Sequence, residues 1–347
     1  MDLIHPPMKV DVAAALRECS RDGKRVLVIG GRTHVDKGNP CEVDAELWMT
    51  QLNRLVAYEP AEMVAVVEAG MRFGALDRLL AENQQEWSAA APEEATVGGI
   101  IAAAVNSPRR LTVGPVRDSV LEVELVTGDG RLVRGGARTV KNATGYDLPR
   151  LVAGSLGTLG AIVQVALRLR PRPKARRTLV WQTDQPIDLG LRLLDGVPLP
   201  TAVLATPHSV ELRLEGWPEA VAAQADAALE VAAGFEDIEH APFPVSAPWL
   251  DEPVVAEAST HPSGISAAVG HAGDRWGALL GVGIVWAGLP ADGEALARLR
   301  AAVPLAPVIK GPGGLGSAPP ARAIRRRLKA SFDPAGILAP GRFWGNV

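Results

Sequence analysis

The stretch Thr96-Val97-Gly98-Gly99, which runs directly into Ile100-Ile101-Ala102-Ala103-Ala104-Val105, decides the fold prediction. The apolar run predicts a helix that begins near the two glycines. The first amides of a helix have no acceptor inside the helix and lie at the positive end of its dipole. We therefore expect the amides of Thr96 to Gly99 to face an anionic group such as a pyrophosphate.

Two further glycine loops accompany this stretch. Gly30-Gly31 follows a short apolar strand predicted at residues 25–29, and consecutive backbone amides after a strand can bind an anion. Thr33 adds a hydroxyl. The third loop is Gly154-Ser155-Leu156-Gly157-Thr158-Leu159-Gly160. Each loop alone fits an ordinary turn, but three such loops indicate a place where the backbone approaches a ligand.

The composition limits the class of protein. A chain of 347 residues corresponds to about two domains. Lys and Arg number 36 against 39 Asp and Glu, a net charge of −3, which argues against a basic nucleic-acid binder. The two cysteines, Cys19 and Cys41, are too few for a disulfide scaffold or a four-cysteine metal site. Two reduced thiols in a cytoplasmic protein are the simpler interpretation.

The sequence predicts neither a secretory signal nor a membrane span. Asp2, Pro6 and Pro7 stand where a signal needs a basic start and an apolar run. The longest uncharged apolar stretch, residues 276–291, is interrupted by glycines and by Pro290, so it is a poor membrane span. We expect a cytoplasmic protein without a transmembrane segment.

The remaining patterns predict an α+β protein. Helical spacing of apolar residues predicts helices over residues 9–22, 73–82, 219–232, 293–303 and 321–330. Alternating or short apolar runs predict strands over residues 25–29, 56–60, 63–69, 120–127, 131–134, 161–169, 209–214 and 265–269. Asp129-Gly130 between two such runs is typical of a hairpin.

A change of composition marks a predicted domain boundary. Residues 170–177 combine two prolines with dense positive charge, which is typical of a linker, although an ordinary solvated loop is the alternative. Beyond it, strands alternate with helices in the manner of an antiparallel α+β domain. We therefore divide the chain into residues 1–172, 173–320 and 321–347.

Four motifs together resemble the FAD-binding flavoprotein oxidases of the vanillyl-alcohol oxidase / p-cresol methylhydroxylase (PCMH) type. Residues 95–102 resemble the family's A-T-V-G-G-x-I-A, and Gly114-Pro115-Val116-Arg117-Asp118 resembles its G-x-x-R-D. Residues 147–160 resemble D-L-x-x-L followed by G-S-x-G-T-L-G, and residues 332–342 resemble F-D-P-x-G-I-L-N-P-G. The resemblance covers the N-terminal half almost continuously and the end of the chain.

This resemblance implies a fold and a cofactor. Residues 1–172 would form a two-subdomain PCMH-type FAD-binding domain, residues 173–320 a compact α+β cap domain for the substrate, and residues 321–347 a segment that returns to the FAD domain. FAD would bind non-covalently. Carried over position by position, its contacts would be Gly30, Gly31, Arg32, Thr33 and His34 near the diphosphate, Thr96, Val97, Gly98, Gly99, Ala102, Gly114, Arg117 and Asp118 along the cofactor, and Gly154, Gly157, Gly160 and Ile162 at the adenine end.

Several residues depart from the family pattern. Arg32 stands where a third glycine is common; it either costs backbone freedom, if its φ is positive, or supplies charge to the diphosphate. His34 is displaced from the position used for covalent attachment in some members, and a solvent-facing histidine is the alternative to a cofactor contact. Arg117 has the alternative role of a structural partner of Asp118. Ala339 replaces the usual Asn.

A fifth segment resembles part of a catalytic site. Gly270-His271-Ala272-Gly273-Asp274-Arg275-Trp276 resembles H-x-G-D-G-N-x-H of the 2-hydroxy-acid dehydrogenases in this family, without the Gly-Asn and the second histidine. One histidine and one aspartate do not make a metal site, so no metal is predicted. His271 is interpreted as a relic of a substrate site or as a loop histidine.

Within the family, the run Val140-Lys141-Asn142-Ala143-Thr144-Gly145-Tyr146-Asp147 and the short length most resemble the FAD-binding subunits of bacterial glycolate oxidases. This implies an oxidoreductase that acts on CH–OH groups, oxidises glycolate to glyoxylate, and passes electrons through the flavin to an iron–sulfur partner. A carboxylate substrate needs a cation and a base; the candidates are His271, Lys310 and Arg342, and no residue is named catalytic.

The resemblance also implies partners. A second flavoprotein subunit and an iron–sulfur subunit would complete a complex that lies peripherally at the inner membrane. The cluster must belong to another chain, because cluster ligation usually takes four cysteines and this chain has two. The alternatives are a stand-alone FAD-dependent 2-hydroxy acid dehydrogenase of the D-lactate type and a non-catalytic flavin-carrying or scaffold subunit.

Overall fold

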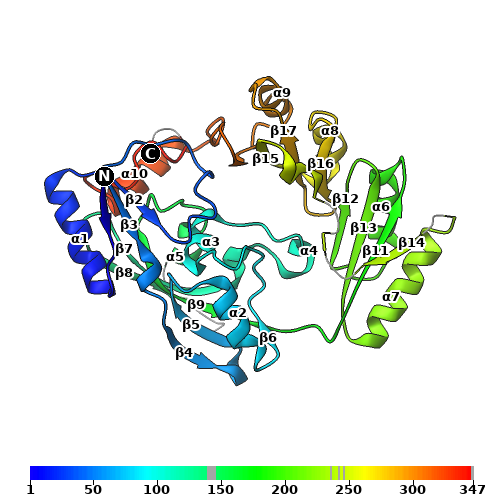
Figure 1. The fold of residues 1–347 in the computed structure, drawn as a ribbon, viewed down its shortest axis with the longest axis horizontal. Coiled ribbons are helices and arrows are strands. Elements are labelled where there is room, and N and C mark those ends of the chain that lie inside the picture. The colour runs from blue at the N-terminus through cyan, green and yellow to red at the C-terminus, as the bar shows by residue number, and fades with distance from the viewer. Residues whose placement is uncertain (139–145, 235–236, 241–242, 245–246, 345–347) are drawn as a thin grey trace. The chain divides into compact units, whose positions relative to one another are not determined.

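The computed structural model describes residues 1–138, 146–234, 237–240, 243–244 and 247–344. Most of the glycolate oxidase-like run, residues 140–145, lies outside these described residues. The chain divides into two compact units (Figure 1). Unit 1 comprises Met1–Ser107, Pro115–Arg172 and the chain from Ala318 onward, and unit 2 comprises Pro108–Gly114 and Pro173–Ser317. The sequence patterns had not indicated that Pro108–Gly114 belongs with unit 2.

Unit 1 begins with a small parallel sheet. Its strand order is β1 (Asp2–Ile4), β3 (Ala45–Trp48), β2 (Val26–Ile29). Helix α1 (Lys9–Asp22) buries Val12 and Leu16 against this sheet. The helix ends where Gly23 adopts a left-handed φ of 68°, the usual helix-terminating conformation of glycine. The predicted helix at residues 9–22 and strand at residues 25–29 are confirmed.

A five-stranded antiparallel sheet forms the rest of unit 1. Its order is β4 (Leu55–Glu59), β5 (Val64–Glu68), β9 (Ala161–Arg168), β7 (Val120–Val126), β8 (Leu132–Gly136). Three helices contribute to its apolar core: α2 (Phe73–Ala81), α3 (Val97–Ala103) and α5 (Leu148–Val152). The predicted Asp129-Gly130 hairpin joins β7 to β8. Strands β6 (Gln85–Glu86) and β10 (Arg170–Pro171) form a separate two-stranded antiparallel sheet.

The C-terminal segment belongs to unit 1 and lies against the small sheet. After α10 (Arg322–Phe332), Leu338 forms a parallel bridge with Val26 at the free edge of β2. The Val26 amide donates to the Ile337 carbonyl, and the Ala339 amide donates to the Val26 carbonyl, both at 2.8 Å. Residues near both ends of the chain thus build the part of unit 1 from which the first glycine loop emerges.

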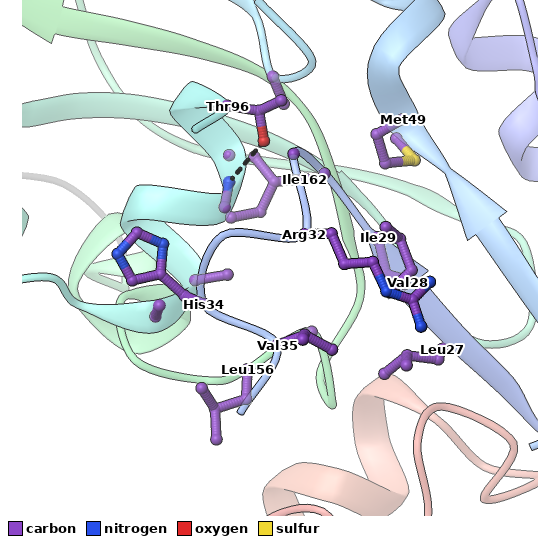
Figure 2. Close-up of a pocket in the computed structure, with 18 of the residues that line it drawn as sticks. Leu27, Val28, Ile29, Arg32, His34, Val35, Met49, Thr96, Leu156 and Ile162 are labelled. Atoms are coloured by element: carbon purple, nitrogen blue, oxygen red, sulfur yellow. Dashed lines mark hydrogen bonds between the residues drawn. The ribbon is translucent and has the colours of Figure 1, made fainter. Parts of the chain in front are cut away.

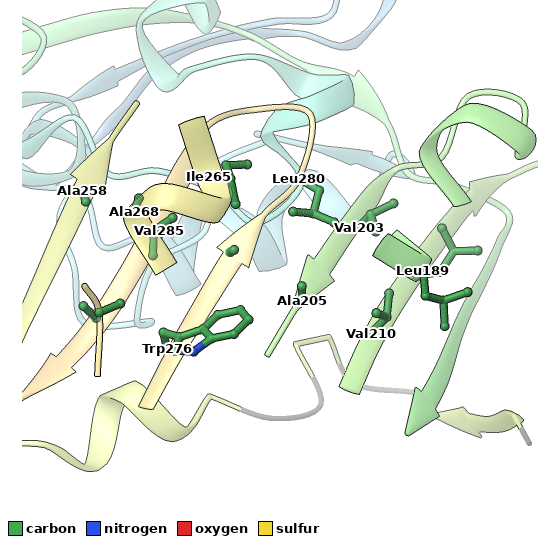
Figure 3. Packing of buried hydrophobic residues seen from close by; sticks show 14 of the residues in the cluster. Leu189, Val203, Ala205, Val210, Ala258, Ile265, Ala268, Trp276, Leu280 and Val285 are labelled. Carbon is green, nitrogen blue, oxygen red and sulfur yellow. The ribbon is translucent and has the colours of Figure 1, made fainter. Parts of the chain in front are cut away.

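Unit 2 is built on one eight-stranded antiparallel sheet. Its order is β14 (Asp237–His240), β11 (Ala175–Gln182), β13 (Ser209–Gly216), β12 (Ala202–Ala205), β16 (Arg275–Leu279), β17 (Ile284–Leu289), β15 (Val254–Ser259), β18 (Val308–Lys310). Its helices are α4 (Arg110–Val113), α6 (Pro186–Gly196), α7 (Pro218–Val231), α8 (Ile265–Val269) and α9 (Glu294–Ala302). Figure 3 shows Leu189 of α6 and Ile265 of α8 packed with side chains of the strands. The predicted antiparallel α+β layout is confirmed.

One predicted element is wrong. Residues 265–269, expected to be a strand, form helix α8. The preceding turn Pro262–Gly264 is capped by the His261 side chain, which accepts from the Ser263 amide, and leads directly into the helix. Ile265 and Ala268 are buried three positions apart, a helical spacing that five residues are too short to establish from sequence.

No helix among the described residues is long and apolar enough to cross a membrane. The described part of the chain also contains no group of three or more His, Cys, Asp or Glu side chains arranged to hold a metal ion.

Candidate functional site

A pocket in unit 1 collects most of the residues predicted to bind a cofactor. Figure 2 shows it between the loop that follows β2, the start of α3 and the loop that precedes β9. Apolar side chains such as Val28, Met49 and Ile162 form part of its wall. The predicted residues that line it are Gly30, Gly31, Arg32, Thr33, His34, Thr96, Gly98, Gly99, Ala102, Gly157, Gly160 and Ile162.

The loop after β2 supplies a row of available donors to this pocket. Within the described residues, the backbone amides of Gly30, Gly31, Arg32 and Thr33 donate to no protein acceptor. Consecutive N–H groups in a loop with a left-handed residue form an anion-binding concavity, and Arg32 has a φ of 60°. Four free donors in succession fit a diphosphate group.

Both glycines of this loop are required by its close approach to the segment before α3. A Cβ at Gly30 would lie 2.0 Å from Thr96 Oγ1, and a Cβ at Gly31 would lie 2.1 Å from the Glu94 carbonyl oxygen. Neither distance is possible for a real Cβ. The glycine pair therefore lets two parts of the pocket wall meet.

The start of α3 differs from the prediction. The amides of Val97 and Gly98 donate to backbone carbonyls of the segment after β5, at 2.9 and 2.7 Å. The Gly99 amide donates to the hydroxyl of the N-cap residue Thr96 at 3.3 Å. The expectation that these helix-start amides face an anion is wrong for these three residues, because a neighbouring segment and the cap already satisfy them.

The loop before β9 docks onto the end of α3. The Gly154 amide donates to the Ile101 carbonyl at 3.0 Å, and the Leu156 amide donates to the Ala102 carbonyl at 2.9 Å. Leu156 and Gly157 both adopt left-handed backbone conformations, which turn the chain toward the pocket that they line. Gly154 fixes this loop but is not among the residues that line the pocket.

The Arg32 side chain is paired within the protein. Its Nη1 lies 3.0 and 3.1 Å from the two carboxylate oxygens of Glu46, and its guanidinium carbon lies 5.8 Å from the centre of the Trp48 ring. Of the two predicted alternatives for Arg32, the structure has the positive φ, and Glu46 neutralises the charge.

His34 is half-buried and lines the pocket. Its Nδ1 lies 2.9 Å from the Thr33 hydroxyl. The side chain of His34 is visible beside the loop in Figure 2.

The remaining predicted cofactor residues lie elsewhere. Gly114 belongs to unit 2. Arg117 and Asp118 lie in a short 3₁₀ helix of unit 1, form an ion pair at 3.8 Å, and do not line the pocket. This geometry corresponds to the structural alternative for Arg117. Val97, the first residue of α3, is fully buried in the apolar core of unit 1.

The three catalytic candidates are divided between the two units. His271 is exposed after α8, and Lys310 at the end of β18 donates to the Leu250 carbonyl; both belong to unit 2. Arg342 belongs to unit 1 and lines the pocket, but its Nη2 donates to the carbonyls of Val35 and Lys37 at 2.6 and 2.8 Å. Arg342 thus holds the loop after β2 in place.

Lys329, near the end of the helix predicted at residues 321–330, is buried. Its ammonium group donates to the carbonyls of Thr158 and Leu338 and to the Asp333 carboxylate, at 2.7–2.8 Å. Burial lowers the pKa of Lys329, and the Asp333 charge opposes that shift. The residue joins α10, the third glycine loop and the C-terminal segment. The sequence signal for this ion pair is the spacing of four residues between Lys329 and Asp333, the Asp of the F-D-P motif.

The chain is similar to several known proteins. The family profile described as an FAD binding domain matches residues 3–136. Glycolate oxidase subunit GlcE of Escherichia coli is 38% identical over 128 residues, 36% of this chain and 37% of that protein. The mitochondrial D-lactate dehydrogenase [cytochrome] of Arabidopsis thaliana is 29% identical over 178 residues, 50% of this chain and 30% of that protein. The matched regions thus span about a third of each of these relatives.

A solved structure extends the likeness to nearly the whole chain. Alkyldihydroxyacetonephosphate synthase superposes with a TM-score of 0.71 at 15% identity, covering 97% of this chain and 75% of that one. This likeness concerns the fold alone. The profile match places an FAD binding domain at residues 3–136, and the superposition shows that the chain has the fold of this synthase.

Proposed function

We propose that this chain is an FAD-dependent oxidoreductase subunit that oxidises glycolate or a related 2-hydroxy acid and passes electrons to an iron–sulfur partner. The observation that carries the proposal is the row of four unpaired amides, Gly30 to Thr33, in a pocket of an FAD binding domain. Relatives named as a glycolate oxidase subunit and a D-lactate dehydrogenase support the substrate class.

The residues of the pocket fit FAD. The amides of Gly30 to Thr33 would hold the diphosphate, and Gly157, Gly160 and Ile162 would lie along the adenine end. When bound, FAD supplies the acceptor for two electrons from the substrate and can release them singly to a one-electron partner. The protein's own contribution is binding and orientation: Arg342 and Lys329 hold the two glycine loops through backbone carbonyls.

A second candidate function is a flavin-carrying subunit without turnover of its own. One observation favours it. The Arg342 guanidinium is engaged with backbone carbonyls, so it is not available as a substrate clamp. In this case the base and the carboxylate clamp lie in a partner subunit.

Anaerobic titration of the FAD-loaded protein with glycolate, and separately with D-lactate, tests the proposal. Loss of the oxidised flavin absorbance supports an enzyme that turns over by itself. Flavin that is bound but stays oxidised supports the carrier function, and the partner must then be added to observe reduction. Acetate, which lacks the hydroxyl, is the control. A protein that binds no FAD would exclude both functions.

A further inference from the structure

Arg32 holds an unfavourable backbone conformation at the centre of the donor loop. Its φ of 60° is left-handed, and a residue with a Cβ pays for this conformation, whereas glycine does not. If nothing opposed it, the loop would relax toward a negative φ at this residue. The amides of Gly31 to Thr33 would then no longer form one row of donors.

The contacts of the Arg32 side chain oppose that relaxation. The guanidinium binds both oxygens of Glu46 at 3.0 and 3.1 Å and packs over Trp48. Trp48 Nε1 donates to Glu46 Oε2 at 2.9 Å, so the carboxylate has two side-chain partners. Both contacts come from one guanidinium nitrogen, Nη1, and hydrogen bonds between charged groups are stronger than those between neutral groups.

Glu46 is a rigid anchor for this contact. It lies in β3, next to Leu27 of β2 in the sheet register, and its residue is only 3% exposed, whereas the Arg32 side chain is 48% exposed. A buried carboxylate without a cation is unfavourable. Glu46 therefore favours loop conformations in which the Arg32 guanidinium reaches its carboxylate. Because Glu46 is held in β3, a loop that relaxed would lose this contact.

We propose that Glu46 is a positioning residue for cofactor binding: through Arg32 it holds the loop of residues 30–33 in the conformation that presents its amides. A glycine at position 32 would adopt the positive φ without cost. In this chain the ion pair between Arg32 and Glu46 compensates for that cost. This inference rests on the proposed FAD site.

A double-mutant cycle at positions 32 and 46 tests this role of the Arg32–Glu46 ion pair, which we call the clamp. Flavin fluorescence on full-length apoprotein gives the Kd for FAD. We expect E46Q to raise this Kd by about tenfold, the population shift expected when a left-handed conformation loses its support. In the R32G background, E46Q is expected not to weaken FAD binding. Glycine adopts a positive φ without support from Glu46, and E46Q removes a carboxylate charge that R32G has left without its cation. R32K keeps the positive charge and offers a single donor nitrogen, as Nη1 of Arg32 does, so it is expected to weaken binding less than E46Q.

The control is E122Q. Glu122 is also buried and accepts from the half-exposed Arg134 and Arg138, but it lies in β7 and does not line the pocket. It should lower the midpoint of urea unfolding without changing the Kd for FAD. Equal Kd values for wild type and E46Q, or an equal effect of E46Q in both backgrounds, would overturn the clamp alone. Wild-type protein that binds neither FAD nor inorganic pyrophosphate would overturn both the clamp and the proposed function.

Discussion

At the scale of single residues, Lys329 makes the sharpest prediction. Lys329→Met removes a buried cation, leaves the fully buried Asp333 carboxylate uncompensated, and deprives two carbonyls of their donor. We expect the free energy of unfolding of unit 1 to fall by about 3–5 kcal/mol, the range for breaking a buried pair. Urea unfolding followed by tryptophan fluorescence measures it.

A matched substitution separates this effect from loss of a surface charge. Lys24 pairs with Asp2 at 2.7 Å, but both side chains are about half exposed. Lys24→Met should change the free energy of unfolding by less than about 1 kcal/mol. Equal losses in the two variants would show that burial of Lys329 is not what stabilises the C-terminal segment.

The same scale shows how far sequence reasoning reaches. Arg32 and Ala339 stood out as departures from glycine and asparagine, the residues that tolerate left-handed backbone best, and both have positive φ values, 60° and 41°. The pairing of Arg32 with Glu46 was not predictable, because it depends on β3 lying beside β2. Local conformation can be inferred from residue type, whereas a partner 14 positions away depends on the sheet.

At the scale of elements, the contact between the first glycine loop and the start of α3 can be tested by compensation. Gly30→Ala should lower the free energy of unfolding by about 1–3 kcal/mol, because the new Cβ overlaps Thr96 Oγ1. In a Thr96→Ala background that atom is gone, and we expect Gly30→Ala to cost less than about 0.5 kcal/mol. Gly31→Ala is the control, since its clash is with a backbone carbonyl and should persist in both backgrounds. Urea unfolding of the apoprotein decides the comparison.

Elements whose boundaries are marked by residues within or next to them were predictable from the sequence. The Gly23 terminus of α1 and the Asp129-Gly130 turn are local, and both elements form as predicted. The helix-start amides of α3 were misassigned because their acceptors come from the segment after β5, which is distant in sequence. The strand prediction at residues 265–269 was wrong for a different reason. A run of five residues is compatible with both the helical and the strand period of apolar residues.

At the scale of the whole molecule, each unit has apolar cores of its own. Leu76, Val123 and Val165 belong to a core of unit 1, and Leu193, Leu212 and Val285 belong to a core of unit 2. The division between Arg172 and Pro173 falls within the change of composition at residues 170–177, but Arg170–Pro171 and Ala175–Gln182 form strands β10 and β11 and are not a linker. The excursion of Pro108–Gly114 into unit 2 had no such signal, since its Arg109 pairs with the distant Glu215.

Separate cores and a pocket lined by unit 1 residues predict that FAD stabilises one unit only. Scanning calorimetry of the apoprotein should show two transitions. FAD at a hundred times its Kd adds about 2.7 kcal/mol to the unit that binds it, which corresponds to a rise of about 5–10 °C in one midpoint. Leu212→Ala, in the unit 2 core, identifies the transition that should not respond to FAD. A single transition that moves as a whole would instead mean that the two units unfold together, and that cofactor binding in unit 1 stabilises unit 2 as well.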